Sequence, residues 1–379
     1  MSGADPLGGL PAHEPGGPAD RSRELPRAAR AVRPPTPTTL LLLATLAACF
    51  CVQLALSPAH DALDPLWLYR LGSLHEPSVE AGDFFRLGSY AFLHIGVAHF
   101  AVNAAALWVL MRPLEVSFGG SAALGLFAAA ALAGGCASAL HARLSGELFL
   151  QAAGASGGIF GLFGATGALF FRLRHQLPRE ALRGAMATLF ANLVLNAIIA
   201  LYAPVDNYAH VGGLLAGALC ALAVPHPALP RRPWHGLSRA VLIGCAFALA
   251  AMGGAAAARA ASPRERVLRV PGFTARAPYM LPQPARGGQA VSAVGLLAAI
   301  VRSEEPPPTD GETRQLGGRR WVAVPLQPRG DAAWVRALAL VAPASTGSVE
   351  VVVHCHRRSC QDLVDVAADT IASTLTRSP

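Results

Sequence analysis

The feature that most constrains this chain is a series of seven apolar stretches, each near the length that crosses a lipid bilayer. A membrane-spanning helix needs ~20 mostly apolar residues. Composition agrees, because 53% of the 379 residues are hydrophobic and only 14% are charged, which is too apolar for an ordinary soluble domain. We therefore expect an all-α polytopic membrane protein. The stretches lie near residues 38–57, 89–111, 120–141, 155–171, 186–203, 208–224 and 238–258.

The charges between the stretches predict how the chain is oriented. The sequence has no lysine, so its formal net charge of +8 comes from arginine. Arginines cluster after the fourth and the sixth stretch, and loops rich in Arg remain in the cytoplasm. We expect a bacterial inner membrane protein with a cytoplasmic N-terminus, and seven crossings then place residues 262–379 outside. This distribution favours membrane topology over nucleic-acid binding. The clustered residues are Arg172, Arg174, Arg179, Arg183, Arg231, Arg232 and Arg239.

Four parts follow from these patterns. Residues 1–37 are rich in Pro, Gly, Ala and Arg and are predicted to be a disordered cytoplasmic segment. Residues 38–225 hold the first six predicted spans, and 238–258 the seventh. The remaining 262–379 read as a small α+β extracytoplasmic domain, with strands at 319–326, 334–341 and 349–354 and a helix at 361–375. A secretory signal at 38–57 is an alternative, although the segment before it is long for that.

The seven cysteines give no metal spacing. Five of them lie in apolar stretches, where cysteine packs as a small hydrophobic residue. Only Cys355 and Cys360 lie in a polar region, and they can pair if that region is in an oxidising compartment. Spacing alone leaves this pairing open.

Polar side chains inside the apolar stretches point to function, because burying them in a membrane is costly. His99 and Asn103 are four residues apart and share one face of the second helix, while His94 is turned away. The fourth stretch opens with Ser156 and the sixth with His210. On the predicted topology all three helices carry these groups near the outer side, so the groups can meet at one depth.

These groups suit acyl transfer. A serine becomes a nucleophile when a base takes its proton, and His210 is the best placed base for Ser156. Small residues favour close helix packing, and Gly213 and Gly217 share a face with His210 while Gly157 follows Ser156. The backbone around Ser156 and Gly154, with the side chains of His99 and Asn103, can supply donors to a developing oxyanion.

Simpler interpretations exist for each residue taken alone. A Gly-x-Ser-Gly segment in a small-residue helix is often only a packing feature, and a histidine at a helix end is often interfacial. The coincidence of complementary groups in three stretches favours catalysis. Asp206 is either a solvated turn residue or a third group that orients His210.

Together these residues resemble the rhomboid family of intramembrane serine proteases, over residues 38–225. The resemblance rests on His94-x4-His99-x3-Asn103, on Gly154-x-Ser156-Gly157, and on Ala209-His210-x-Gly212-Gly213. It extends to Phe85-Arg86, where the family often has Trp-Arg, and to the segment from Glu115 to Gly119.

The resemblance implies a six-helix core with one added helix. Ser156 would be the nucleophile, His210 the base, and His99 and Asn103 would hold the oxyanion together with the backbone of Ser156 and Gly154. His94, Gly157, Gly213 and Gly217 would support this site. The implied substrates are single-span membrane proteins within the lipid bilayer, and no metal or cofactor is implied.

Other chemistries fit less well. The sequence lacks the His-Glu-x-x-His of zinc proteases, a pair of intramembrane acids for an aspartyl mechanism, and any lysine for a serine–lysine dyad. The main alternative is a catalytically inactive relative that binds or escorts membrane helices. A transporter is less favoured, because the stretches lack paired charges.

Overall fold

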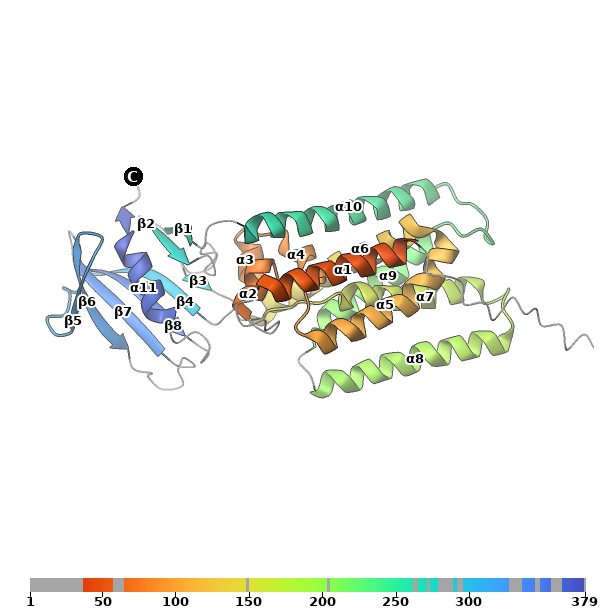
Figure 1. Ribbon diagram of the computed structural model, residues 1–379, viewed down its shortest axis with the longest axis horizontal. Coiled ribbons are helices and arrows are strands. Elements are labelled where there is room, and N and C mark those ends of the chain that lie inside the picture. Colours follow the sequence, from red (N-terminus) through yellow and green to blue (C-terminus); the bar gives the residue numbers. More distant parts are fainter. Residues whose placement is uncertain are drawn as a thin grey trace, which may run out of the picture. The chain divides into compact units, whose positions relative to one another are not determined.

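The computed structural model shows a helical part followed by a part rich in β-strands (Figure 1). The part of the chain that it describes comprises residues 37–56, 65–147, 150–202, 205–261, 265–270, 273–278, 289–291, 296–326, 336–344, 348–355 and 363–377. The predicted disordered segment at residues 1–37 lies outside these residues except for its last position, as does Cys360.

Five described helices are long and apolar enough to cross a membrane. A shorter apolar helix, α9 (Asn207–Ala223), falls on the sixth predicted stretch. The 24-residue helix α8 (Arg179–Tyr202) covers the fifth. The five are α1 (Pro37–Leu56), α5 (Val97–Phe118), α6 (Gly120–Ser145), α7 (Ser156–Leu173) and α10 (His235–Ala260).

The second predicted stretch begins too early. Residues 89–96 are not part of the spanning helix, which starts at Val97 after Gly96. Four short helical segments precede it instead: α2 (Pro65–Leu71), α3 (Glu76–Glu80), α4 (Arg86–Ser89) and the 3-10 turn η2 (Tyr90–Phe92). Their apolar residues are buried against protein, and burial gives the same hydrophobic pattern as a lipid environment. His94 therefore precedes the helix that carries His99.

Two local devices hold the first helices together. Gly119, with φ at 88°, is the single residue between α5 and α6, a backbone conformation that favours glycine. On α5, the Glu115 carboxylate accepts hydrogen bonds from the backbone N–H of Thr38 at 3.0 Å and of Thr39 at 2.9 Å. Those N–H groups lie in the first turn of α1, where a helix leaves its donors unsatisfied. Glu115 thus caps α1 from a neighbouring helix.

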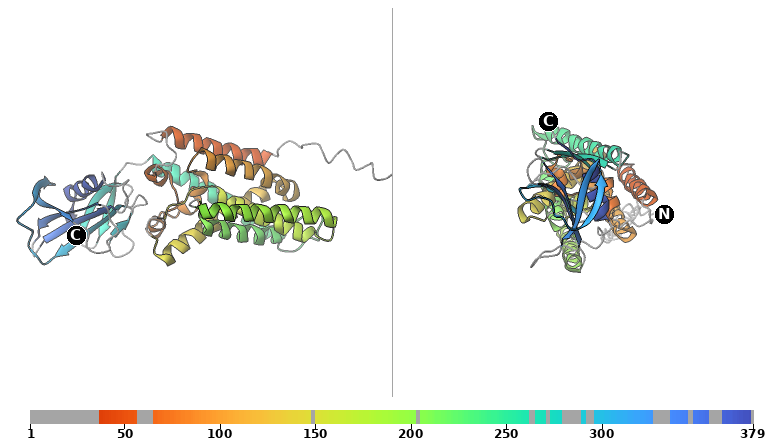
Figure 2. Two further views of the ribbon diagram at one scale, coloured as in Figure 1. Left: turned by 90° about the horizontal axis from the view of Figure 1, so that it is seen from below. Right: turned by 90° about the vertical axis from the view of Figure 1, so that its left-hand side faces the viewer.

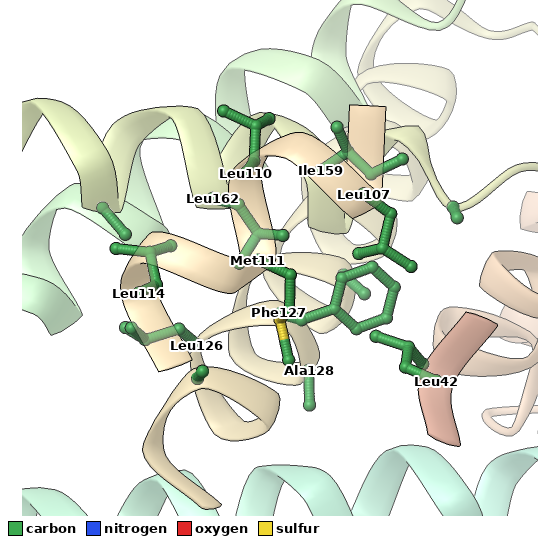
Figure 3. Close-up of a cluster of buried hydrophobic side chains, with 14 of the residues drawn as sticks. Leu42, Leu107, Leu110, Met111, Leu114, Leu126, Phe127, Ala128, Ile159 and Leu162 are labelled. Carbon is green, nitrogen blue, oxygen red and sulfur yellow. The ribbon is translucent and has the colours of Figure 1, made fainter. Parts of the chain in front are cut away.

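The core of the helical part lies between α1, α5, α6 and α7 (Figure 3). Leu42, Met111, Phe127 and Leu162 from these four helices are each at most 5% exposed. The seventh predicted span, α10, packs against α6 and the short segments before α5. Its buried residues are spaced by seven and so return to one face of the helix every two turns. These residues are His235, Leu242, Leu249 and Ala256.

The C-terminal part has its own hydrophobic core. Six antiparallel strands form a sheet in the order β3-β4-β8-β7-β6-β5, and three form a second sheet in the order β1-β2-β9. Helix α11 (Leu363–Ser373) lies along the strands (Figures 1 and 2). The strands are β1 (Glu265–Val270), β2 (Phe273–Pro278), β3 (Gln289–Val291), β4 (Leu296–Ser303), β5 (Glu312–Leu316), β6 (Arg319–Leu326), β7 (Arg336–Pro343), β8 (Ser348–Cys355) and β9 (Thr376–Arg377).

The helix and three strands that the sequence suggests in this part fall on α11, β6, β7 and β8. The other strands were not anticipated. Arg314 on β5 pairs with Glu312 at 3.0 Å, and it reaches Asp369 at 2.8 Å and Asp365 at 3.2 Å on α11. The Glu312 carboxylate, together with these two, raises the pKa of Arg314. Cys355 is in a disulfide.

Candidate active site

The structure brings Ser156 and His210 into hydrogen-bond contact. Ser156 is the first residue of α7, and His210 lies in the first turn of α9. The Nε2 atom of His210 is 2.8 Å from Oγ of Ser156, which is within the range that a nucleophile and its base require. His210 is buried at 8% exposure, whereas Ser156 is half-buried. The serine therefore retains access that the histidine has lost.

Glycines allow α7 and α9 to approach this closely. A Cβ on Gly213 of α9 would overlap the carbonyl oxygen of Gly157, and a Cβ on Gly217 would overlap that of Gly161. In the other direction, a Cβ on Gly164 of α7 would overlap the carbonyl oxygen of Leu214. The glycine faces expected from the sequence therefore meet backbone to backbone. No side chain larger than hydrogen fits without moving the helices apart.

An aromatic ring fixes the orientation of the imidazole. Phe160 stacks on His210 with ring centroids 4.0 Å apart and planes within 10°. It follows Ser156 by four residues on α7, so both side chains lie on one face of that helix. We did not single out Phe160 in the sequence. Its spacing from Ser156 was the available signal, but many phenylalanines share such spacing with a serine in an apolar helix.

The loop before Ser156 lies beside His99. Gly154 has φ at 148°, and a Cβ placed on it would be 2.7 Å from Cε1 of His99 and 3.6 Å from Oγ of Ser156. The bare glycine thus separates the imidazole edge from the serine. The backbone N–H of Ile95 approaches Nδ1 of His99 at 3.4 Å, which favours the tautomer with its proton on Nε2. The Nε2 atom of His99 would lie 3.1 Å from a Cβ placed on Gly154, two residues before Ser156.

Asn103 lies one turn after His99 on α5 and is buried at 5% exposure. Its side-chain amide donates to the carbonyl oxygen of His99 at 2.9 Å. An amide nitrogen carries two hydrogens, so one such bond fixes the group and leaves it a second hydrogen. The predicted common face of His99 and Asn103 is therefore present on α5.

His94 is fully buried next to this group. Its backbone N–H donates to Oε1 of Gln53 at 3.0 Å, and its carbonyl oxygen accepts from the same side chain. The ring packs edge-on against Phe50, His99 and Phe100, with centroids 5.3 to 6.0 Å apart. Its two nitrogens have no hydrogen-bond partner among the described residues. His94 therefore contacts His99 through ring packing.

The Asp206 side chain, interpreted from the sequence as a turn residue or as a group that orients His210, makes a hydrogen bond at the start of α9. It is the N-cap of α9, and its Oδ1 accepts the backbone N–H of Ala209 at 2.9 Å. An N-cap satisfies one of the free donors at a helix start. This places the carboxylate on the backbone of the turn that carries His210.

The side chains here suit proton transfer and acyl transfer. Within the described ranges, no group of three His, Cys, Asp or Glu side chains is arranged to hold a metal ion. His210 contacts Ser156, and His99 lies beside Gly154, two residues before Ser156.

Comparison with known proteins identifies the helical part. Residues 81–226 match the family model described as the rhomboid domain. The chain is 31% identical over 165 residues to rhomboid protease GluP of Bacillus subtilis (42% of this chain, 30% of the relative). It is 36% identical over 150 residues to RHOMBOID-like protein 5 of Arabidopsis thaliana (40% and 47%).

Another relative is named as inactive. Inactive rhomboid protein 2 of Homo sapiens is 32% identical over 142 residues, which is 37% of this chain and 16% of that protein. The chain thus spans less than half the length of each of these three relatives. With its apolar helices, the match makes this an integral multi-pass membrane protein.

Proposed function

This chain is a rhomboid-family protein, and we propose that it is an intramembrane serine endopeptidase that cleaves other membrane proteins with a Ser156–His210 dyad. The observation that carries the proposal is the 2.8 Å contact between Oγ of Ser156 and Nε2 of His210. The two residues are 54 apart in the chain, and only the glycine packing of two separate helices brings them together. A serine and a histidine held in this way form a nucleophile with its base.

In the proposed reaction, His210 takes the proton from Oγ of Ser156 as this oxygen attacks the scissile carbonyl carbon. The oxyanion that forms accepts hydrogen bonds from the backbone N–H of Ser156 and from the side chains of His99 and Asn103. His210 then gives its proton to the departing amine as the C–N bond breaks. A water molecule, deprotonated by His210, then attacks the acyl-enzyme. The bond from the acyl carbon to Oγ breaks, His210 returns its proton to Ser156, and the new carboxyl group is released.

Two other residues shape this site. Gly154 lies between His99 and Ser156, and its lack of a side chain leaves room there for a substrate carbonyl. Asp206 stabilises the start of α9 as its N-cap. We therefore propose a dyad whose histidine is held by Phe160 and by the helix itself.

The proposed substrates are single-span membrane proteins. A peptide bond in an intact helix is shielded by its own backbone hydrogen bonds, so cleavage requires a segment that unwinds readily. Small or helix-breaking residues near the cut favour this. The lipid bilayer is the medium in which enzyme and substrate meet.

We further propose a bacterial inner membrane location, with the N-terminus in the cytoplasm and residues 262–379 outside. The disulfide of Cys355 supports this side, because disulfides persist in oxidising compartments. An alkaline phosphatase fused to the C-terminus, which is active only after export, would be active on this topology. An inactive fusion would place the domain in the cytoplasm.

The second candidate is an inactive relative that binds or escorts membrane helices. Its support is the similarity to a human protein named as inactive. The retained contact between Ser156 and His210 favours the enzyme, because a binding protein needs no activated serine.

The test is cleavage of a single-span reporter by the purified chain in liposomes. We expect wild type to cut, and Ser156→Ala and His210→Ala to be silent while folding normally. Ser145→Ala and His175→Ala are matched controls at exposed positions and should cut like wild type. Activity in Ser156→Ala would overturn the mechanism. If wild type neither cuts nor reacts with a serine-directed fluorophosphonate, the inactive relative is the correct candidate.

A further inference from the structure

Helix α10, the seventh predicted span, contacts the short segments that precede α5. Its residue Met252 lies over Gly88 of α4, where a Cβ would be 2.6 Å from the methionine sulfur and 3.1 Å from Cδ1 of Leu249. One residue further along α10, Gly253 faces Phe92, whose Cε2 would be 3.1 Å from an added Cβ. The two elements are therefore packed without spare space between them.

The C-terminal end of α10 also makes hydrogen bonds and close contacts with these segments. The Arg70 guanidinium donates two hydrogen bonds, at 3.0 and 3.2 Å, to the carbonyl oxygen of Ala260, the last residue of the helix. Ala256 lies against Gly72, where a Cβ would be 2.8 Å from the alanine methyl. The Ser89 hydroxyl in turn donates to the Gly72 carbonyl oxygen. The segment from α2 to η2 therefore packs along the C-terminal half of α10.

The same segment contacts the serine loop from its other side. The carbonyl oxygen of Tyr90 in η2 accepts the backbone N–H of Gly154 at 3.0 Å. The Tyr90 hydroxyl donates to the Ala131 carbonyl oxygen on α6 at 2.8 Å. A Cβ on Gly157 would be 2.7 Å from that hydroxyl. Tyr90 is 2% exposed and therefore lies wedged among η2, α6 and the residues on both sides of Ser156.

We propose that α10 positions the nucleophile: by packing on Gly88 and Phe92 it fixes Tyr90, and Tyr90 fixes Gly154 and Gly157 on either side of Ser156. This inference rests on the proposed function. It assigns Met252, Gly88 and Tyr90 as positioning residues that touch no substrate. On this proposal α10 contributes to the site by positioning Ser156 indirectly, through Tyr90.

The test compares two α10 variants. Met252→Ala opens a gap over Gly88, and a small displacement of a catalytic group lowers kcat steeply, so we expect a kcat loss of about tenfold with KM unchanged. Phe247→Ala is the matched control, because Phe247 lies on the same helix at 73% exposure. Met252→Leu conserves volume and should restore kcat. Gly88→Ala, which crowds the contact from the other side, should repeat the loss in protein that remains folded.

A second measurement does not depend on activity. Hydrogen exchange at the Gly154 amide reports its bond to Tyr90, and we expect exchange about tenfold faster in Met252→Ala than in wild type or Phe247→Ala. Unchanged exchange would overturn the inference, whether or not the protein cleaves anything. Lowered melting temperature with kcat and exchange unchanged would also overturn it, since α10 would then only add stability. Altered exchange in a protein that never cleaves would support the positioning and refute the proposed function.

Discussion

The interface between α7 and α9 and the interface between α10 and α4 are formed by different groups. Between α7 and α9, glycines face backbone carbonyls, and a single methyl group has no room at Gly213 or Gly217. Between α10 and α4, the side chains of Met252 and Leu249 lie over Gly88. Backbone contact leaves little freedom, whereas flexible side chains can shift by changing rotamer.

The two interfaces therefore differ in how directly they determine the position of Ser156 and His210. The α7–α9 contact sets the distance between Ser156 and His210 directly, because both residues lie in the first turns of those helices. The α10 contact acts through Tyr90 and so tolerates more change. Substitutions should therefore cost most activity at the first interface and less at the second.

The largest effect is expected for Gly213→Ala. The added methyl overlaps the Gly157 carbonyl, so α7 and α9 must separate and the dyad must lengthen. We expect kcat to fall about a hundredfold, because misplacing reacting groups by about 1 Å has that order of effect. Reporter cleavage and a thermal melt would measure it.

The matched control for this variant is Gly167→Ala. It adds the same methyl to α7, where nothing lies within 4 Å, and alanine favours the helix. It should keep wild-type kcat. If Gly213→Ala cleaves as well as Gly167→Ala, the glycine contact does not set the dyad geometry.

A smaller loss is expected for Phe160→Ala. Removing the ring that stacks on His210 frees the imidazole to rotate, and aromatic pairs contribute ~1 kcal/mol. We expect kcat to fall about tenfold, with Phe160→Tyr close to wild type. Single-turnover cleavage would measure the chemical step. A loss in KM alone would mean that Phe160 contacts substrate instead.

Asp206→Ala should affect stability more than chemistry. The variant loses the N-cap of α9, which costs ~1 kcal/mol, while Asp206→Asn keeps a capping oxygen. We expect both to retain kcat within about threefold, with a lower melting temperature only for alanine. A hundredfold loss of kcat in Asp206→Asn would instead make Asp206 an orienting member of a triad.

The sequence predicted much of the helical part, and the reason is visible in particular residues. Ser156, His210, Gly213 and Gly217 are polar or small residues in apolar surroundings, and such departures are costly unless they serve packing or chemistry. The apolar stretches themselves marked most helices. Where protein burial and lipid exposure give the same pattern, at residues 89–96, the predicted boundary was wrong.

Contacts between elements far apart in the sequence could not be predicted in this way. The stacking of Phe160 on His210 and the bond from Gly154 to Tyr90 depend on how helices cross, and no local pattern encodes crossing geometry. The same holds for β1 to β5 and β9, which gain their stability from neighbouring strands. Residues such as Phe160 and Tyr90 look like ordinary core residues in the sequence.

The smallest effect concerns the C-terminal end of α10. Arg70→Met removes two hydrogen bonds to the Ala260 carbonyl while keeping much of the apolar stem. A hydrogen bond to a charged group contributes about 1.5–3 kcal/mol, and partial exposure of Arg70 places it at the low end, so the last turn of α10 should fray and the melting temperature should fall. Because Met252 and Gly253 lie two turns earlier, their contacts with Gly88 and Phe92 should persist and kcat should change by less than about twofold. Hydrogen exchange along residues 252–261 would locate the fraying. Exchange at Gly154 could also rise in this variant. The end of α10 would then help to position Gly154, and the difference between the α7–α9 interface and the α10 interface would be smaller.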